Sequence, residues 1–257
     1  MTALSIDHAI QMADKFASNG NITTAMGLYK KVLNACPDNE QAKQGIVKLA
    51  EIKNAEPIDP SKQTFERLFG LFQQGHMQEL VEQSNVLIKK FPKSFNLWNL
   101  LGAANTNLNC LENAEFNFQK ACALNPLSPA AFNSLGIVLK LGGKIEESLE
   151  AYRKAISIKP DFAEAYNNMA IALDTHGLVD DAVKAYEHAL ALNPNYSEAY
   201  SNLAGLYGAR GQNNKAFETY KALLEIEPNN YQALNNMASL LIDLGDLEEA
   251  ERIFEKT

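Results

Sequence analysis

The sequence predicts an all-α fold, a right-handed solenoid (superhelix) built from tandem helix-turn-helix units. The first observation is a constant spacing of 34 residues between five prolines: Pro92, Pro126, Pro160, Pro194 and Pro228. The second is a glycine that recurs at the same spacing about half a unit before the proline, as at Gly143, Gly177 and Gly211. A constant period of this length indicates one supersecondary unit copied in tandem, which stacks into a solenoid instead of a globule.

Residues 1–54 predict a separate N-terminal block, in which one helix pair is followed by an extra helix. Pro37 closes the pair, and residues 40–54 then carry apolar residues along one helical stripe. The interval from Pro37 to Pro92 is 55 residues, which is 21 more than one period. The proline-containing stretch 55–60 predicts a linker after this block.

Residues 61–257 predict the solenoid itself. Its units are 61–94, 95–128, 129–162, 163–196 and 197–230, followed by a partial unit at 231–257. In each unit a turn is expected between two helices, and the closing proline ends the second helix. The turn positions are held by Gly75, Asn109, Gly143, Gly177, Gly211 and Gly245, the residue types that tolerate a left-handed backbone. Unit 61–94 is degenerate, since Thr64 and Arg67 replace apolar residues, as expected at the end of a solenoid.

Small residues recur at two places in each unit and predict close helix packing. In the first helices they are Gly102, Gly136, Ala170, Ala204 and Ala238. In the second helices they are Ala114, Ser148, Ala182, Ala216 and Ala250. An aromatic residue follows the second set by four positions, as at Phe118 and Tyr152, and is expected to fill the gap between layers.

Charge and composition disfavour several classes of partner. The net charge is −8 with a pI near 5.1, and no run of Lys and Arg is longer than two. Because nucleic acids and anionic membrane surfaces attract basic proteins, both are disfavoured as partners. No run of apolar residues approaches the 18 or so that a membrane span needs, so we expect no membrane insertion. No secretory leader is visible at the start, and the three cysteines lack C-x-x-C spacing. These features predict a cytoplasmic protein with free thiols.

No pattern of catalytic or metal-ligating residues stands out. The segment from Gly136 to Lys144 has the wrong spacing for a phosphate-binding loop, and no strand precedes it. The Gly205, Gly208 and Gly211 series does not match a dinucleotide-binding motif. The four histidines show no metal-ligand spacing. We therefore expect no enzyme activity, no cofactor and no metal in this chain.

The most informative pattern for function is a set of asparagines that recurs from repeat to repeat. The predicted peptide-binding residues on the concave face are Asn99, Asn133, Asn167, Asn168, Asn202, Asn235 and Asn236. They recur just before the leucine or methionine of each first helix, although asparagine is a poor helix former. Its amide both donates and accepts hydrogen bonds, which suits an extended peptide backbone. The alternative is that the repeats share this consensus by recent duplication without using it. The inner slots hold few cations, which disfavours a clamp for acidic peptide tails.

The motif Trp98-x-x-Leu101-Gly102, with Ala114-x-x-x-Phe118 and Pro126, resembles the tetratricopeptide repeat, and the resemblance covers nearly the whole chain. The chain also resembles the N-terminal tetratricopeptide regions of bacterial proteins that continue into a sulfotransferase or O-linked N-acetylglucosamine transferase domain. In O-linked N-acetylglucosamine transferases, whose repeats the Tyr-Asn-Asn-Met-Ala string at residues 166–170 resembles, an inner asparagine row holds the substrate polypeptide. The resemblance implies a protein- or peptide-binding scaffold that forms the recognition region of a larger bacterial protein.

A second hypothesis is self-assembly. The chain stops at Thr257, before the proline that would close the last unit. Either a longer protein continues from here, or the last unit or the N-terminal block docks against another copy to form a homo-oligomer.

Overall fold

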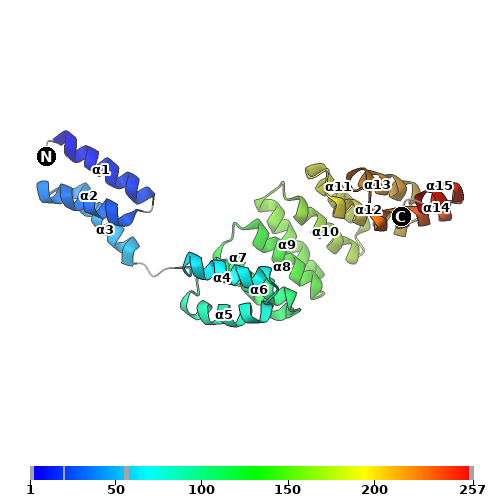
Figure 1. Cartoon of the computed structure of the whole chain (residues 1–257), viewed down its shortest axis with the longest axis horizontal. Helices are drawn as coiled ribbons and strands as arrows, with labels where there is room; N and C mark the ends of the chain where they lie inside the picture. The colour runs from blue at the N-terminus through cyan, green and yellow to red at the C-terminus, as the bar shows by residue number, and fades with distance from the viewer. Residues whose placement is uncertain (1–2, 20, 55–57, 255–257) are drawn as a thin grey trace. The chain divides into compact units, whose positions relative to one another are not determined.

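The computed structural model describes residues 3–19, 21–54 and 58–254, and within them every regular element is an α-helix. Fifteen helices follow one another in this described part of the chain. Within residues 3–54 and within residues 62–254, neighbouring helices pack against each other in chain order, so the predicted all-α solenoid fold is confirmed. The chain divides into two compact units, Met1–Ile58 and Asp59–Thr257 (Figure 1).

The first unit contains α1 (Ala3–Ser18), α2 (Ile22–Ala35) and α3 (Glu40–Asn54). Its core surrounds Tyr29 of α2, which is 3% exposed and donates a hydrogen bond to the Asp14 carboxylate. A Cβ atom on Gly45 of α3 would lie 2.5 Å from the Tyr29 ring, so only glycine allows this approach of α3 to α2. Of the predicted linker 55–60, residues 55–57 lie outside the described residues.

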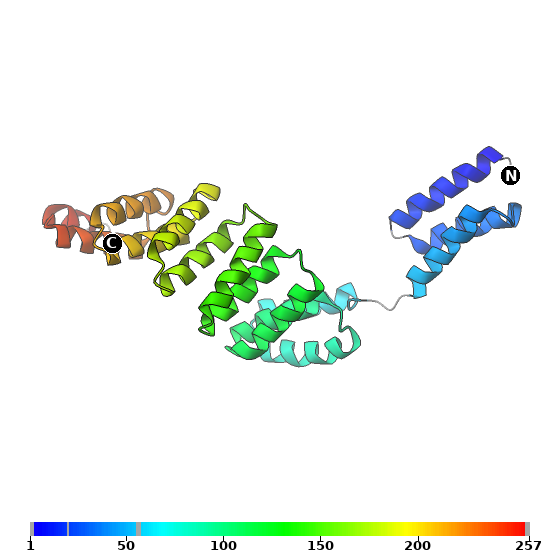
Figure 2. The same cartoon turned by 180° about the vertical axis from the view of Figure 1, so that it is seen from behind.

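The second unit is a row of six helix pairs (Figures 1 and 2). The pairs are α4 (Lys62–Gln73) with α5 (Met77–Lys90), α6 (Phe95–Asn107) with α7 (Leu111–Leu124), α8 (Pro129–Leu141) with α9 (Ile145–Ile158), α10 (Ala163–Thr175) with α11 (Val179–Leu192), α12 (Ser197–Ala209) with α13 (Asn213–Ile226), and α14 (Tyr231–Leu244) with α15 (Leu247–Phe254). The second helix of each pair packs on the first helix of the next, and α8 also contacts α6 and α10. The first helices therefore form one layer of this unit.

The turns inside the pairs adopt the left-handed backbone that the sequence predicts. The five turn glycines have φ between 68° and 82°, and Asn109 is the one non-glycine residue with positive φ among the described residues, at 57°. The residue after the turn position donates its backbone N–H to the carbonyl five residues earlier, as from Lys144 to Leu139 (2.9 Å). This bond satisfies an otherwise unpaired carbonyl at the helix end and fixes where the second helix begins.

Small residues let the two helices of a pair approach closely. A Cβ atom on Gly102 would lie 2.8 Å from the Phe118 ring, and one on Gly136 would lie 2.5 Å from the Tyr152 ring. The small residues of the second helices are equally enclosed, since Ala182 is 0% exposed. The predicted close packing is therefore confirmed at these positions.

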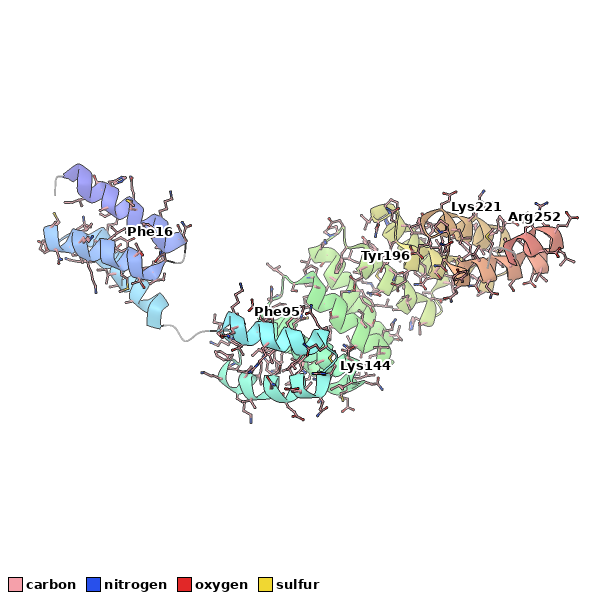
Figure 3. All side chains as sticks on the ribbon, in the orientation of Figure 1. Phe16, Phe95, Lys144, Tyr196, Lys221 and Arg252 are labelled. Atoms are coloured by element: carbon pink, nitrogen blue, oxygen red, sulfur yellow. The ribbon has the colours of Figure 1, made fainter. Side chains whose placement is uncertain are left out.

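Exposed ion pairs connect successive helix pairs at their turn ends. Lys144, labelled in Figure 3, precedes α9 and pairs with Glu115 of α7 at 2.8 Å. Arg210 pairs with Asp180 at 2.9 Å across the interface two pairs further along. Exposed pairs of this kind contribute about 0–1 kcal/mol, so they orient the turns more than they stabilise the stack.

Candidate peptide-binding face

The seven predicted asparagines lie on the layer of first helices, on α6, α8, α10, α12 and α14. Two hydrogen bonds between asparagines join neighbouring helices of this layer. The Asn168 amide nitrogen donates to the Asn133 side-chain oxygen at 3.1 Å, and Asn202 donates to Asn167 at 3.3 Å. We call the side of these five helices that carries the asparagines the first-helix face.

Two of the asparagines are buried and hold the layer together. Asn133 is 3% exposed and Asn167 is 0% exposed. Each also donates its amide to a glutamate at the start of the next first helix, Asn133 to Glu164 at 2.9 Å and Asn167 to Glu198 at 3.3 Å. In each of these two residues the side-chain oxygen and one N–H of the amide form hydrogen bonds between repeats. Both residues therefore position their neighbours in this structure.

The remaining asparagines are accessible. Asn99, Asn168, Asn202 and Asn236 are half-buried, and Asn235 is exposed. Within the described residues, the side-chain oxygens of Asn168 and Asn202 accept no hydrogen bond, and each amide has a second N–H. Asn168 and Asn202 thus each present one acceptor and one donor, one repeat apart, as a peptide backbone requires.

The sequence contains a signal, beyond the 34-residue period, that distinguishes the buried asparagines from the accessible ones. Asn133 and Asn167 are each followed by a glutamate 31 residues later and by an asparagine 35 residues later, and these residues are their partners. The residues that follow Asn99 by 31 and 35 positions in the sequence are Ala130 and Ser134. Asn99 has no such partners, and it stays half-buried.

The five helices of the first-helix face carry net negative charge. The five helices carry four carboxylates and one ammonium group: Glu164, Asp174, Glu198, Asp243 and Lys140. Burial, together with the charges of Glu198 and Glu164, raises the pKa of Tyr196 to about 12; Figure 3 labels this residue, which precedes α12. Burial lowers the pKa of Lys140, and the charge of Glu198 opposes that shift. This field disfavours anionic groups near α10 and α12.

A hollow of about 160 Å³ opens between α6 and α8 on this layer. Its lining residues are Ala103, Thr106, Asn107, Phe118, Ser134, Ile137 and Val138. Sequence reasoning missed it, although Phe118 and Ser134 differ from the tyrosine and asparagine found at equivalent positions of later units. A larger hollow of about 690 Å³ lies at the turns after α4 and α6, away from the asparagines.

Metal sites and membrane spans are both absent from the residues that the structure describes. Within the part of the chain that the structure describes, no cluster of three His, Cys, Asp or Glu side chains could hold a metal ion. No described helix is both long and apolar enough to cross a membrane. The three cysteines Cys36, Cys110 and Cys122 are unpaired thiols.

Comparison with known proteins places repeats of one kind along the second half of the chain. Models described as TPR repeat or tetratricopeptide repeat match residues 138–177, 163–196, 185–218 and 208–257. No curated protein matches the sequence.

Solved structures with a similar fold share little sequence with this chain. PilF from Pseudomonas aeruginosa is 17% identical with a TM-score of 0.64, and the match covers 74% of this chain and 86% of that one. MamA (41-end) from Desulfovibrio magneticus RS-1 is 18% identical with a TM-score of 0.60, covering 68% and 99%. YrrB, described as a TPR protein with an unusual peptide-binding site, is 18% identical with a TM-score of 0.56, covering 73% and 95%. These likenesses show the fold, and the matched models identify tetratricopeptide repeats within residues 138–257.

Proposed function

We propose that this chain is a binding scaffold that holds an extended peptide along the first-helix face. The observation that carries the proposal is the pair of half-buried amides Asn168 and Asn202. Each is fixed by a buried asparagine of the preceding first helix, and each keeps one donor and one acceptor. A peptide backbone offers matching groups whatever its side chains are.

Fixing these amides before binding favours affinity. Ordering a side chain at an interface costs about 0.5–1.5 kcal/mol, and a side chain that is already hydrogen-bonded avoids much of that cost. Asn133 and Asn167 therefore act as positioning residues for Asn168 and Asn202. Asn99, Asn235 and Asn236 extend the proposed contact surface to α6 and α14.

Selection from a random-peptide phage library on the full chain tests this function. We expect the wild type to enrich peptides, and the double variant Asn168→Ser, Asn202→Ser to lose most of that enrichment. Serine is the residue at the equivalent position 134, so the double variant is expected to fold. A matched control, Lys154→Ser with Glu218→Ser, changes exposed residues of the second helices and should enrich as the wild type does. Equal enrichment by the wild type and the asparagine variant would contradict the proposal.

The resemblance to transferase-linked repeats extends the proposal. In that case the chain would present substrates as the recognition region of a larger bacterial protein, without catalysing a reaction itself. A cytoplasmic location and the exclusion of nucleic acids likewise stay predictions from the sequence.

Self-association is a second candidate, favoured by exposed apolar side chains on the last helix pair. Tyr231, Ile242, Leu244 and Leu247 are 47–64% exposed. Ile242, Leu244 and Leu247 lie at or beside the turn between α14 and α15, and neighbouring exposed apolar side chains often mark a protein interface. Light scattering across the micromolar range tests this candidate. A defined oligomer that Leu247→Glu dissociates supports self-association, and a monomer at every concentration excludes it.

A further inference from the structure

We infer that the hollow between α6 and α8 is a socket for one aliphatic side chain of the bound peptide, whose neighbouring segment is basic and lies over α10 and α12. The inference rests on the proposed peptide-binding function and adds the chemistry of the ligand. The seven residues that line the hollow define the socket.

Three side chains at this interface are smaller than their equivalents at the next two interfaces along the row; at the last interface Gly205 takes the place of Ala103, and the difference there comes from Phe118 and Ser134 alone. Phe118 stands where later units have Tyr152, Tyr186 and Tyr220. Ser134 stands where they have Asn168, Asn202 and Asn236, and Ala103 stands where the next two have Ile137 and Ile171. Each difference removes heavy atoms from the same place in the repeat.

The last repeat interface shows what fills this place elsewhere. The Asn236 amide donates to the Tyr220 hydroxyl at 3.1 Å, so these two polar ends meet between the helices. Their equivalents at the socket are Ser134 and Phe118, which lack both groups of that hydrogen bond. The space that the bond would occupy is open and lined mainly by carbon.

The socket has the size and polarity for an aliphatic group. Its volume of about 160 Å³ is close to that of an apolar cavity of about 150 Å³ that accepts benzene. Two of its three polar side chains already donate within their own helix, Thr106 to the Gly102 carbonyl and Asn107 to the Ala103 carbonyl, both at 2.9 Å. An aliphatic side chain therefore displaces water there without leaving these groups unpaired.

The charges on the helices beyond the socket indicate that the adjoining segment of the peptide is basic. Helix α6 carries no charged residue, and α8 carries only Lys140. Glu164 on α10 and Glu198 on α12 accept hydrogen bonds from Asn133 and Asn167, the residues that also bind the amides of Asn168 and Asn202, and α10 carries a further carboxylate at Asp174. A peptide anchored in the socket and held by these amides meets net negative charge, which attracts lysine and arginine.

The test uses the same random-peptide library on the full chain and on the filled variant Ala103→Ile, Phe118→Tyr, Ser134→Asn. Each new side chain is one that this protein already uses at an equivalent position, so the filled variant is expected to fold. Peptides selected by the wild type should share one Leu, Ile, Val or Met with Lys or Arg on one side. Peptides selected by the filled variant should keep the basic preference and lose the aliphatic one. Ser157→Asn, which makes one of these changes on an exposed site of α9, should select as the wild type does.

A synthetic peptide from the wild-type selection gives the quantitative readout. Changing its shared aliphatic residue to alanine should weaken binding to the wild type about tenfold or more, because buried carbon is lost. The same change should have little effect on binding to the filled variant. Should the filled variant lose helicity, the single variant Ser134→Asn provides the same comparison.

The outcomes separate this inference from the proposed function. If selected peptides depend on Asn168 and Asn202 but show no aliphatic preference, the socket is overturned and peptide binding stands. An aliphatic preference that survives filling also overturns the socket. If the wild type enriches no peptide, both proposals are overturned.

Discussion

At the scale of single residues, one side-chain type serves two purposes in this protein. Asn133 and Asn167 are buried and join repeats, whereas Asn168 and Asn202 are half-buried and present hydrogen-bonding groups outward. Each buried residue keeps the accessible one of the next first helix in place, and on α10 a structural residue and a binding residue, Asn167 and Asn168, are neighbours in sequence. Replacing either member of such a pair should therefore give different phenotypes.

Asn167→Ala should lower the free energy of unfolding by about 1–3 kcal/mol, because Asn202 and Glu198 lose a buried hydrogen-bonding partner. Urea unfolding followed by circular dichroism measures this change. Asn235→Ala is the control, since Asn235 is exposed and alanine is the better helix former. Equal stability of Asn167→Ala and the wild type would refute the positioning role of Asn167.

At the scale of helices, stability depends on small residues between the two members of a pair. Ala182 at the start of α11 is fully enclosed, while Ala191 near the end of the same helix is exposed. Ala182→Leu should overpack the contact and cost about 1–3 kcal/mol. Ala191→Leu, the same change in the same helix, should alter stability by about 0.5 kcal/mol or less. Melting curves that do not distinguish the two variants would contradict this packing assignment.

Helices and turns could be predicted from the sequence because their signals are local. The positions that require left-handed backbone were identified from spacing alone, and this includes Asn109. The burial of Asn133 and Asn167 could not be predicted from the period. It depends on partners that lie 31 and 35 residues further along the chain. The socket depends on the absence of atoms at Phe118, Ser134 and Ala103, which a consensus pattern treats as tolerated variation.

At the scale of the whole molecule, buried tyrosines tie stability to alkaline pH. Burial is the main cause that raises the pKa of Tyr29 and of Tyr196 to about 12, and it also raises the pKa of Tyr152 and Tyr186. In an unfolded chain tyrosine loses its proton near pH 10. The stabilisation from neutral buried tyrosines is thus complete below about pH 10 and is lost as the pH rises through the folded values.

We expect the free energy of unfolding to fall between about pH 10 and about pH 12, measured by urea unfolding together with tyrosinate absorbance. In the double variant Tyr186→Phe, Tyr196→Phe the fall should be shallower, because phenylalanine does not titrate. A slope identical to that of the wild type would show that these hydroxyls do not govern the alkaline transition.

The asparagine bonds also give the row of helix pairs an uneven stiffness. Bending the row so that its first helices separate stretches the bonds from Asn168 to Asn133 and from Asn202 to Asn167, which span α8 to α12. Between α6 and α8 the equivalent residues are Ser134 and Asn99, and no such bond joins them in the described structure. The row therefore flexes more easily at this junction than at the two that follow. This more flexible junction coincides with the socket, so an inserted side chain would act there as a wedge that sets the local curvature.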